Sequence, residues 1–427
     1  MKKVIYPRKI IRGIINLPGD KSISHRAIIL GAIANGETKI KNFLFSKTCM
    51  TTLNCLKDLG AEIKINAGDI LINGKGLFGL KESKKILNAE TSGTTLRLLL
   101  GLLAAQKFNS RITCEGSLKN RPMERVLLPL KEMGAKIKCD SNNIFEITPS
   151  EIFGMKYKMP VASAQVKSSI LLASLYLKDH EVEITEKKLT RDHTENMINY
   201  FGGNIIFNED KTKILSSSGE NLKGKEIIIP GDISSAAFFI VLALLIPDSH
   251  LILKNILVNP RRMGLIKILR QMGAKIFVKN SCEIYDGELV ADIEIFYSKI
   301  NGIEISGQTV VDMIDEIPVF VVACLFANGI SVIKNAEELR VKESDRIMSV
   351  VENFNRLGAN IKECEDGMII ENKFDFKPVK NIGHKDHRIA MSLVILFLVT
   401  GNKLILEDAE CIDDSMPDFF DYLETFF

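Results

Sequence analysis

The segment CLKDLGAEIKI, residues 55–65, determines how the chain is organised, because close variants of it recur. It has the pattern of an amphipathic helix end, a glycine, and a short strand in which apolar and polar residues alternate. The variants are PLKEMGAKIKC at 129–139, INYFGGNIIFN at 198–208, ILRQMGAKIFV at 268–278 and NFNRLGANIKE at 353–363. A glycine after a helix commonly takes a left-handed backbone conformation. We therefore predict left-handed turns at Gly60, Gly134, Gly202, Gly273 and Gly358.

These glycines are 74, 68, 71 and 85 residues apart, so about six such units would fill the 427 residues. The last helical segment, PDFFDYLETFF, is followed by no strand, whereas residues 4–17 look like a strand pair with no helix before it. We expect the N-terminal strand to complete the sixth unit. The predicted fold is α/β with two domains, one of residues 1–19 plus 231–427 and one of residues 20–230. The tripeptide PGD occurs at 18–20 and 230–232, where we expect two hinge crossings.

The bulk composition is that of an ordinary globular protein. Hydrophobic residues make up 46% and charged residues 26%, and the formal net charge is +3. A nucleic-acid-binding protein normally carries a basic stripe, which this balance does not indicate. The longest apolar runs, 236–246 and 389–399, are shorter than the roughly 20 residues of a membrane helix. No signal peptide is evident, so we expect a cytoplasmic protein that binds neither nucleic acid nor membrane.

The cysteines and glycines suggest no cofactor site. The eight cysteines form no CxxC pair and no metal-like cluster with the histidines, so we interpret them as buried, reduced thiols. Gly74, Gly76 and Gly79 match GxGxxG, but no convincing helix and no well-placed acidic residue follow. We interpret this segment as a glycine-rich turn, and we expect no metal and no cofactor.

Three hydroxyl-rich segments precede apolar runs and resemble helix starts. They are DKSISHR at 20–26, TSGTTLR at 91–97 and SAQVKSS at 163–169. Free backbone amides at a helix start favour an anion. Ser and Thr also cap helices routinely, so for each segment alone capping remains an open alternative. Three such segments, each with a cation, favour an anionic ligand.

Charged clusters elsewhere fit the same interpretation. Arg121 and Arg125 flank PME, Arg191 lies in TRDH, and further cations lie in RVKESDR at 340–346 and KDHR at 385–388. On a helix, Lys342 and Arg346 would share a face, an unfavourable pairing that a shared anion would explain. A solvated face is the alternative. In VVDMIDEIPV an aspartate could act as a general base or cap a helix. Together the residues indicate a cleft between two domains that binds small ligands carrying phosphate and carboxylate.

Along its whole length the sequence resembles the 5-enolpyruvylshikimate-3-phosphate (EPSP) synthase family. The resemblance rests on LPGDKSISHRA, SGTTLRLLLGLLA, NRPMERVLLPL, SAQVKS, TRDHTE, PGDISSAAFF, MIDEIPV, ELRVKESDR and DHRIAMS. It implies transfer of the enolpyruvyl group of phosphoenolpyruvate to the 5-hydroxyl of shikimate 3-phosphate, with release of phosphate. It also implies a two-domain inside-out α/β barrel, each domain made of three βαβαββ repeats, that closes on its ligands. We expect a monomer.

The resemblance also implies roles for individual residues. Asp315 would accept the hydroxyl proton, Glu343 would protonate the methylene carbon and take that proton back, and Lys21 would meet both substrates. The residues expected to bind shikimate 3-phosphate are Lys21, Ser22, Arg26, Ser163, Ala164, Gln165, Arg191, Asp315 and Lys342. Those expected to bind phosphoenolpyruvate are Lys21, Gly93, Arg121, Gln165, Arg346 and Arg388.

The chain departs from the family pattern at three positions. Thr91 replaces the usual asparagine, Ala164 replaces a serine of other members, and Asp414 stands where some members carry a lysine for phosphoenolpyruvate. That lysine contact is not transferred. Two alternatives remain: the related enolpyruvyl transferase acting on UDP-N-acetylglucosamine, and a repeat scaffold without catalysis. The UDP-N-acetylglucosamine enzyme has Lys-Asn where this chain has Lys21-Ser22, which argues against the first alternative. Scaffold repeats run about 20–50 residues, shorter than the units found here, which argues against the second.

Overall fold

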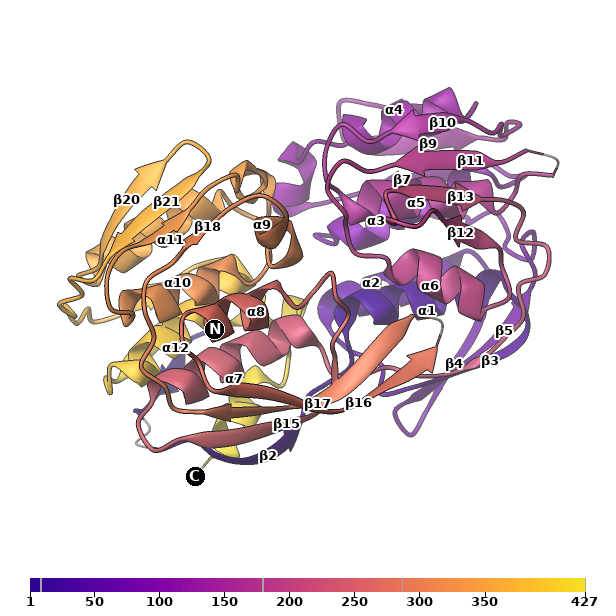
Figure 1. The fold of residues 1–427 in the computed structure, drawn as a ribbon. Coiled ribbons are helices and arrows are strands. Elements are labelled where there is room, and N and C mark those ends of the chain that lie inside the picture. Colours follow the sequence, from indigo (N-terminus) through magenta and orange to yellow (C-terminus); the bar gives the residue numbers. More distant parts are fainter. Residues whose placement is uncertain (8–9, 179, 286, 427) are drawn as a thin grey trace. The chain divides into compact units, whose positions relative to one another are not determined.

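One strand arrangement recurs in the sheets of the computed structural model, which describes residues 1–7, 10–178, 180–285 and 287–426. An edge strand pairs in parallel with a second strand, and an antiparallel strand follows. Figure 1 shows the chain as two compact units. Unit 1 comprises Met1–Pro18, Pro230–Cys282 and Leu289–Phe427, and unit 2 comprises Gly19–Ile229 and Glu283–Glu288.

Three four-stranded sheets lie in unit 2, in the orders β14-β3-β5-β4, β6-β7-β9-β8 and β10-β11-β13-β12. Their strands are β3 (Asn35–Lys41), β4 (Glu62–Asn66), β5 (Asp69–Lys75), β6 (Leu87–Asn88), β7 (Ser110–Thr113), β8 (Lys136–Cys139), β9 (Ile144–Thr148), β10 (Lys156–Lys158), β11 (Val182–Thr185), β12 (Ile205–Phe207), β13 (Lys213–Ser216) and β14 (Glu226–Ile228). The helices are α1 (Lys21–Ile33), α2 (Lys47–Asp58), α3 (Gly93–Ala104), η1 (Gly116–Asn120), α4 (Glu124–Glu132), α5 (Ala164–Ser174) and α6 (His193–Tyr200). Each sheet thus accompanies a pair of α-helices.

Unit 1 repeats the pattern in the orders β16-β17-β15-β2, β18-β19-β21-β20 and β1-β23-β22. Its strands are β1 (Lys3–Ile5), β2 (Arg12–Asn16), β15 (His250–Leu257), β16 (Ile276–Tyr285), β17 (Glu288–Phe296), β18 (Glu304–Ile305), β19 (Ser331–Ile333), β20 (Asn360–Cys364), β21 (Gly367–Glu371), β22 (Ile382–Gly383) and β23 (Leu404–Glu407). The helices are α7 (Ile233–Leu245), α8 (Gly264–Gln271), α9 (Gln308–Asp312), α10 (Ile317–Leu325), η2 (Glu337–Val341), α11 (Arg346–Arg356), α12 (His387–Val399), η3 (Ala409–Asp414) and α13 (Phe419–Glu424). The tip of the β16–β17 hairpin, Glu283–Glu288, belongs to unit 2.

The first helix of each pair is apolar on nearly all sides, and its residues are buried accordingly. In unit 1 the helices α7, α10 and α12 pack against one another. The sequence of α7, ISSAAFFIVLALL, has no polar face beyond its first turn, and a helix of that kind is stable only when it is surrounded. Phe238, Phe320 and Phe397 come from these three helices and lie in one hydrophobic core. The start of each such helix is therefore the part that can carry polar chemistry.

The glycines that define the repeat take the predicted conformation. Gly60, Gly134, Gly202, Gly273 and Gly358 have φ angles of 83°, 101°, 97°, 106° and 97°. At Gly358 an added Cβ would also lie 1.8 Å from the Asp375 carbonyl oxygen, so a side chain is excluded on two grounds.

The N-terminal strands differ in part from the prediction. β1 pairs antiparallel with β23, so the chain start does join the last sheet. The expected strand pair, however, is wrong, because β2 pairs in parallel with β15 in a different sheet. The hydrophobic pattern predicted two strands but could not specify their partners, since both neighbours come from more than 200 residues away.

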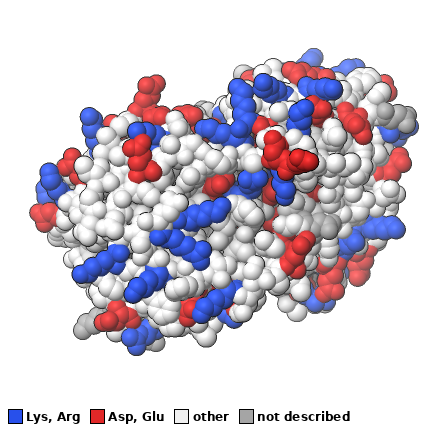
Figure 2. Space-filling model, viewed as in Figure 1, with Lys and Arg blue, Asp and Glu red and all other residues white. Residues whose placement is uncertain are grey.

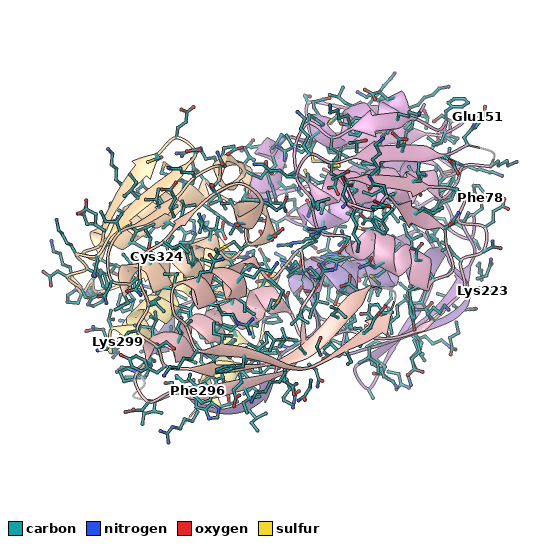
Figure 3. All side chains as sticks on the ribbon, viewed as in Figure 1. Phe78, Glu151, Lys223, Phe296, Lys299 and Cys324 are labelled. Atoms are coloured by element: carbon teal, nitrogen blue, oxygen red, sulfur yellow. The ribbon has the colours of Figure 1, made fainter. Side chains whose placement is uncertain are left out.

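Two smaller predictions concern turns and thiols. The GxGxxG segment is a turn after β5, with Gly76 at φ 82° and the exposed Phe78 at its tip (Figure 3). All eight cysteines are free, but Cys139 and Cys282 are exposed, so the prediction of burial is wrong for these two. Cys324 is buried within α10 (Figure 3). Among the described residues, none of the helices has the length and apolar character needed to cross a membrane.

Candidate functional site

The first turns of α1, in unit 2, carry a group of polar side chains. The Asp20 carboxylate caps the helix by accepting a hydrogen bond from the Ile23 amide at 2.9 Å. Lys21 and Ser22 are half-buried in the first turn, whereas Arg26 is buried. The Arg26 guanidinium donates to Thr194 Oγ1 at 2.6 Å, to Ser168 Oγ at 2.7 Å and to the Ser22 carbonyl at 3.0 Å. These bonds fix Arg26 beside the free amides of a helix N-terminus, which suits an anion.

The start of α3 gathers two arginines around a glycine. Ser92 caps the helix by accepting from the Thr95 amide at 3.2 Å. A Cβ added to Gly93 would lie 3.0 Å from Arg121 Nη1 and 3.1 Å from Arg97 Nη1. Glycine at this position therefore lets both guanidinium groups approach the backbone. Arg97 was not singled out from the sequence, although TSGTTLR contains it.

The start of α5 adds an amide side chain to this arginine group. Ser163 caps α5, and Ala164 is its first residue. Gln165 donates from Nε2 to Thr94 Oγ1 at 2.8 Å, and its Oε1 accepts from Arg97. The sequence left open whether these serines cap helices or bind a ligand, and the structure shows that Ser92 and Ser163 do cap.

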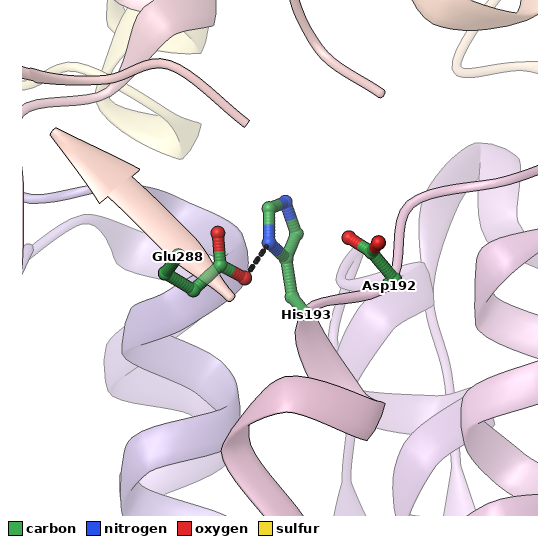
Figure 4. Close-up of side chains that lie close together, drawn as sticks. All are labelled: Asp192, His193 and Glu288. Atoms are coloured by element: carbon green, nitrogen blue, oxygen red, sulfur yellow. Dashed lines mark hydrogen bonds and ion pairs between the residues drawn. The ribbon is translucent and has the colours of Figure 1, made fainter. Parts of the chain in front are cut away.

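The segment TRDH leads into α6, whose first residue is the buried His193. His193 donates from Nδ1 to the Glu288 carboxylate at 2.6 Å, because a carboxylate only accepts (Figure 4). Asn196 Nδ2 donates to the same oxygen at 3.2 Å. Arg191 is half-buried. Burial is the main cause that lowers the pKa of Arg26, and the positive charge of Arg191 lowers it further.

Asp192, His193 and Glu288 are also a group of residues that could hold a metal ion, because their ligand atoms lie within 4.8 Å of one another. Two ligands at about 2.0–2.2 Å from one ion in tetrahedral geometry would be separated by more than 3 Å. The His193–Glu288 distance of 2.6 Å is that of a hydrogen bond. The geometry as it stands therefore fits a carboxylate–histidine pair better than a metal site.

In unit 1 the candidate residues surround Arg346, the first residue of α11. Its guanidinium contacts Asp386 Oδ2 at 2.9 Å, Glu343 Oε2 at 2.7 Å and Asp315 Oδ1 at 3.3 Å. Burial alone would lower the pKa of Arg346, but the carboxylates, Asp386 foremost, raise it above its ordinary value. Arg346 is thus a fixed cation that holds three acidic side chains together.

The prediction that Lys342 and Arg346 share a helix face is wrong. Residues Glu337–Val341 form the short helix η2, and α11 begins only at Arg346. Lys342 lies between them, with its ammonium 3.9 Å from Glu338 Oε1. Asp345 breaks the helix because its side chain caps α11, accepting from the Met348 amide at 3.0 Å.

The start of α12 completes this set. Asp386 caps the helix by accepting from the Arg388 amide at 2.9 Å. Burial raises the pKa of Asp386, but the charge and hydrogen bond of Arg346 together with the charge of His387 lower it below its ordinary value. Arg388 is buried with Nη1 4.0 Å from Glu316 Oε1. The sequence left open that an acidic residue of DMIDE, residues 312–316, caps a helix. At the start of α10 the N-cap residue Glu316 makes no side-chain capping bond, so this alternative is not supported there.

The predicted residues fall into two sets, one in each unit. In unit 2 the set contains Lys21, Ser22, Arg26, Gly93, Arg121, Ser163, Ala164, Gln165 and Arg191, and in unit 1 it contains Asp315, Lys342, Glu343, Arg346 and Arg388. Asp414, at the end of η3, is half-buried and acidic, so it offers no substitute for the lysine of other members. The set in unit 2 offers cations, hydroxyl groups and an amide, whereas the set in unit 1 combines cations with the carboxylates of Asp315 and Glu343.

The chain is similar to known proteins over nearly its whole length. The sequence model of EPSP synthase (3-phosphoshikimate 1-carboxyvinyltransferase) matches residues 5–423. A 3-phosphoshikimate 1-carboxyvinyltransferase of Thermoanaerobacter sp. (strain X514) is 47% identical over 415 residues, which cover 97% of each chain. One of Petrotoga mobilis is 44% identical over 432 residues and 99% of each chain. The solved structure of EPSP synthase from Acinetobacter baumannii has a TM-score of 0.86 and 40% identity, covering 100% of this chain and 98% of the other. This chain therefore belongs to the EPSP synthase family.

Proposed function

We infer that this chain transfers the enolpyruvyl group of phosphoenolpyruvate to the 5-hydroxyl of shikimate 3-phosphate and releases phosphate. Family membership over residues 5–423 supports this activity. The observation that carries it in the structure is Arg346, a buried cation in contact with both Asp315 and Glu343. In this proposal Asp315 is the base and Glu343 the acid, and one guanidinium would hold both for an addition followed by an elimination. The UDP-N-acetylglucosamine alternative is not favoured by the relatives found.

The set in unit 2 would hold the two anions. Arg26, fixed by Thr194 and Ser168, would bind shikimate 3-phosphate together with Lys21 and Ser22. Arg191 and the start of α5, Ser163–Gln165, would bind the same substrate. Phosphoenolpyruvate would lie against Gly93 and Arg121, since planar guanidinium groups suit carboxylate and phosphate. Gln165 reaches Arg97 and Thr94, so it would connect the two substrates.

The set in unit 1 would perform the proton transfers. Asp315 takes the proton of the 5-hydroxyl as that oxygen bonds to C2 of phosphoenolpyruvate, and Glu343 donates a proton to C3. In the resulting tetrahedral intermediate, C2 carries the phosphate, the new ether oxygen and a methyl group, which is the former C3. Glu343 then removes a methyl proton as the C2–O bond to phosphate breaks, which forms the enolpyruvyl ether. Lys342, Arg346 and Arg388 would balance the negative charge of the substrates.

We propose that each unit, which contains α-helices and mixed sheets, is an inside-out α/β barrel and that the hinges lie near 18–20 and 230–232. The proposed domains are 1–19 plus 231–427 and 20–230. Because the acid–base set and the anion set belong to different units, we propose that the domains close on shikimate 3-phosphate. Small-angle scattering should show a smaller radius of gyration with the ligand than without it. An unchanged radius at saturating ligand would refute closure.

We further propose a cytoplasmic monomer that needs no metal, cofactor or nucleic acid. On the face shown in Figure 2, basic and acidic side chains of the described residues occur together on both units. Size-exclusion chromatography with light scattering tests the monomer, and a dimer mass would refute it. Activity after treatment with a chelator tests the absence of a metal requirement.

The activity is tested by measuring phosphate release from phosphoenolpyruvate in three reactions, with shikimate 3-phosphate, with UDP-N-acetylglucosamine and with neither. We expect release only with shikimate 3-phosphate. Release with the sugar nucleotide instead would assign the chain to the alternative activity. No release with either acceptor would refute both activities.

A further inference from the structure

A buried group of charges in unit 2 has no part in the roles given above. The Lys167 ammonium in α5 lies 2.8 Å from Glu186 Oε2 and 2.7 Å from Glu195 Oε1. The three side chains are only 1%, 2% and 0% exposed. Glu186 also accepts from Thr190 Oγ1 at 2.5 Å. Burying such a group costs several kcal/mol per ion and often stabilises no better than apolar residues would, so stability alone explains it poorly.

The position of these three residues connects them with the candidate site. Lys167 follows Gln165 by two residues in α5, and Glu195 in α6 lies four residues after Arg191 in the sequence. Their immediate neighbours Ser168 and Thr194 are the two residues whose hydroxyls accept hydrogen bonds from the Arg26 side chain. Those two hydroxyls also bond to each other at 2.6 Å. The ion pairs of Lys167 with Glu186 and Glu195 therefore connect α5 to α6 next to the two hydroxyl groups that bind Arg26.

The electrostatics couple the same residues. Burial lowers the pKa of Arg26 to about 10, and Glu195 is the largest opposing influence. Burial raises the pKa of Glu195, and Lys167 is the largest opposing influence there. The positive charges of Arg26 and Lys167 and the negative charges of Glu186 and Glu195 thus offset one another in the interior of unit 2.

We propose that Lys167, Glu186 and Glu195 form a positioning triad that holds Arg26 in the arrangement that binds shikimate 3-phosphate. The proposal rests on the proposed function. The triad touches no substrate; it acts through Ser168, Thr194 and Arg26. It predicts that affinity for the acceptor substrate depends on the triad, whereas affinity for phosphoenolpyruvate does not.

The test compares a broken triad with a neutral one. Lys167→Met alone leaves two buried carboxylates unpaired and should strongly destabilise the protein. The triple variant Lys167→Met, Glu186→Gln, Glu195→Gln removes all three charges and should recover most of the lost melting temperature. We expect KM for shikimate 3-phosphate in the triple variant to rise at least tenfold. KM for phosphoenolpyruvate and kcat should stay within about threefold of the wild type.

The direction of the KM change separates positioning from simple charge. Removing the triad removes one net negative charge near an anion site, so electrostatic attraction alone predicts tighter binding of shikimate 3-phosphate. A folded triple variant whose KM for that substrate is unchanged or lower would overturn the proposal. Should the triple variant not fold, Glu195→Gln with Lys167→Met, which keeps the charge balance, is measured in the same way.

A control in the same helix excludes a general loosening of α5. Ser174 and Ser216 are buried and hydrogen-bonded at 2.6 Å near the end of α5. Ser174→Ala should lower the melting temperature and leave KM for shikimate 3-phosphate unchanged. An equal rise of KM in this control would overturn the proposal. A wild-type protein with no turnover of shikimate 3-phosphate would refute the proposed function, whereas normal wild-type turnover with an unaffected triple variant would refute the triad alone.

Discussion

Replacing Gly93 by alanine should separate phosphoenolpyruvate binding from folding. The new methyl group would lie 3.0 Å from Arg121 Nη1 and 3.1 Å from Arg97 Nη1. Both atoms are at the ends of flexible side chains, which can move by the few tenths of an ångström required. Gly93 is the first residue of α3 and is not among the glycines with positive φ, so alanine fits its backbone. Alanine is also favoured over glycine in helices, by up to about 1 kcal/mol.

The size of the effect follows from the displaced arginines. A hydrogen bond to a charged group contributes about 1.5–3 kcal/mol. Losing the equivalent of one such bond would weaken phosphoenolpyruvate binding by about one to two powers of ten, since about 1.4 kcal/mol corresponds to tenfold. Shikimate 3-phosphate, which we place against α1 and α5, should bind as before.

Steady-state kinetics with each substrate varied in turn, together with a melting curve, checks this prediction. We expect KM for phosphoenolpyruvate to rise 10- to 100-fold at an unchanged melting temperature. Gly101→Ala in the same helix is the contrasting variant, because its Cβ would lie 2.1 Å from the Ser169 carbonyl oxygen, and backbone cannot move aside cheaply. Gly101→Ala should lose stability without selectivity for one substrate. An unchanged KM for phosphoenolpyruvate in Gly93→Ala would refute the placement of that substrate.

Three further predictions concern charged residues. Asp315→Ala should keep substrate binding, measured by calorimetry, and lose about 10²–10⁴-fold in turnover, as a general base contributes that much; unchanged turnover would remove Asp315 from the mechanism. Arg97→Lys cannot reproduce the planar contact with Gln165, so KM for phosphoenolpyruvate should rise severalfold, and an equal rise for both substrates would count against the assignment. Asp386→Asn keeps a capping residue but removes the charge paired with Arg346. Because the pKa of Asp386 is lowered in the folded state, its contribution is present above its ordinary pKa of about 4 and is lost as the pH falls. Urea unfolding should therefore show a deficit of about 3 kcal/mol that is nearly constant from pH 7 to about pH 5 and shrinks as the pH falls below about 4, whereas a deficit that grows on acidification would contradict the pairing.

The parts of the fold that depend on local chemistry could be predicted from the sequence. The glycine after each repeated helix takes φ near 100° because the chain must turn there, and that requirement is visible in eleven residues. Strand partners are different. β1 and β2 are separated by six residues, yet they enter different sheets, because each pairing is decided by a strand far away in the chain.

The candidate site shows the same division. Helix starts such as DKSISHR are recognisable because capping and apolar periodicity are local signals. The helix across 340–346 was mispredicted because charge spacing suggested it, whereas Asp345 caps a helix that begins one residue later. The triad around Lys167 could not be predicted, because a lysine within an apolar run has no local partner. Its carboxylates come from segments 19 and 28 residues away in the sequence.

In the proposed reaction, this chain forms the enolpyruvyl ether by protonating and then deprotonating the methylene carbon of phosphoenolpyruvate. Turnover of both substrates in deuterium oxide, with mass spectrometry of the product, tests it most directly. A deuteron delivered to C3 makes a methyl group from which any of three hydrogens can leave. We predict enolpyruvylshikimate 3-phosphate with deuterium in its methylene group. A product without deuterium there, or no enolpyruvyl product, would contradict the account.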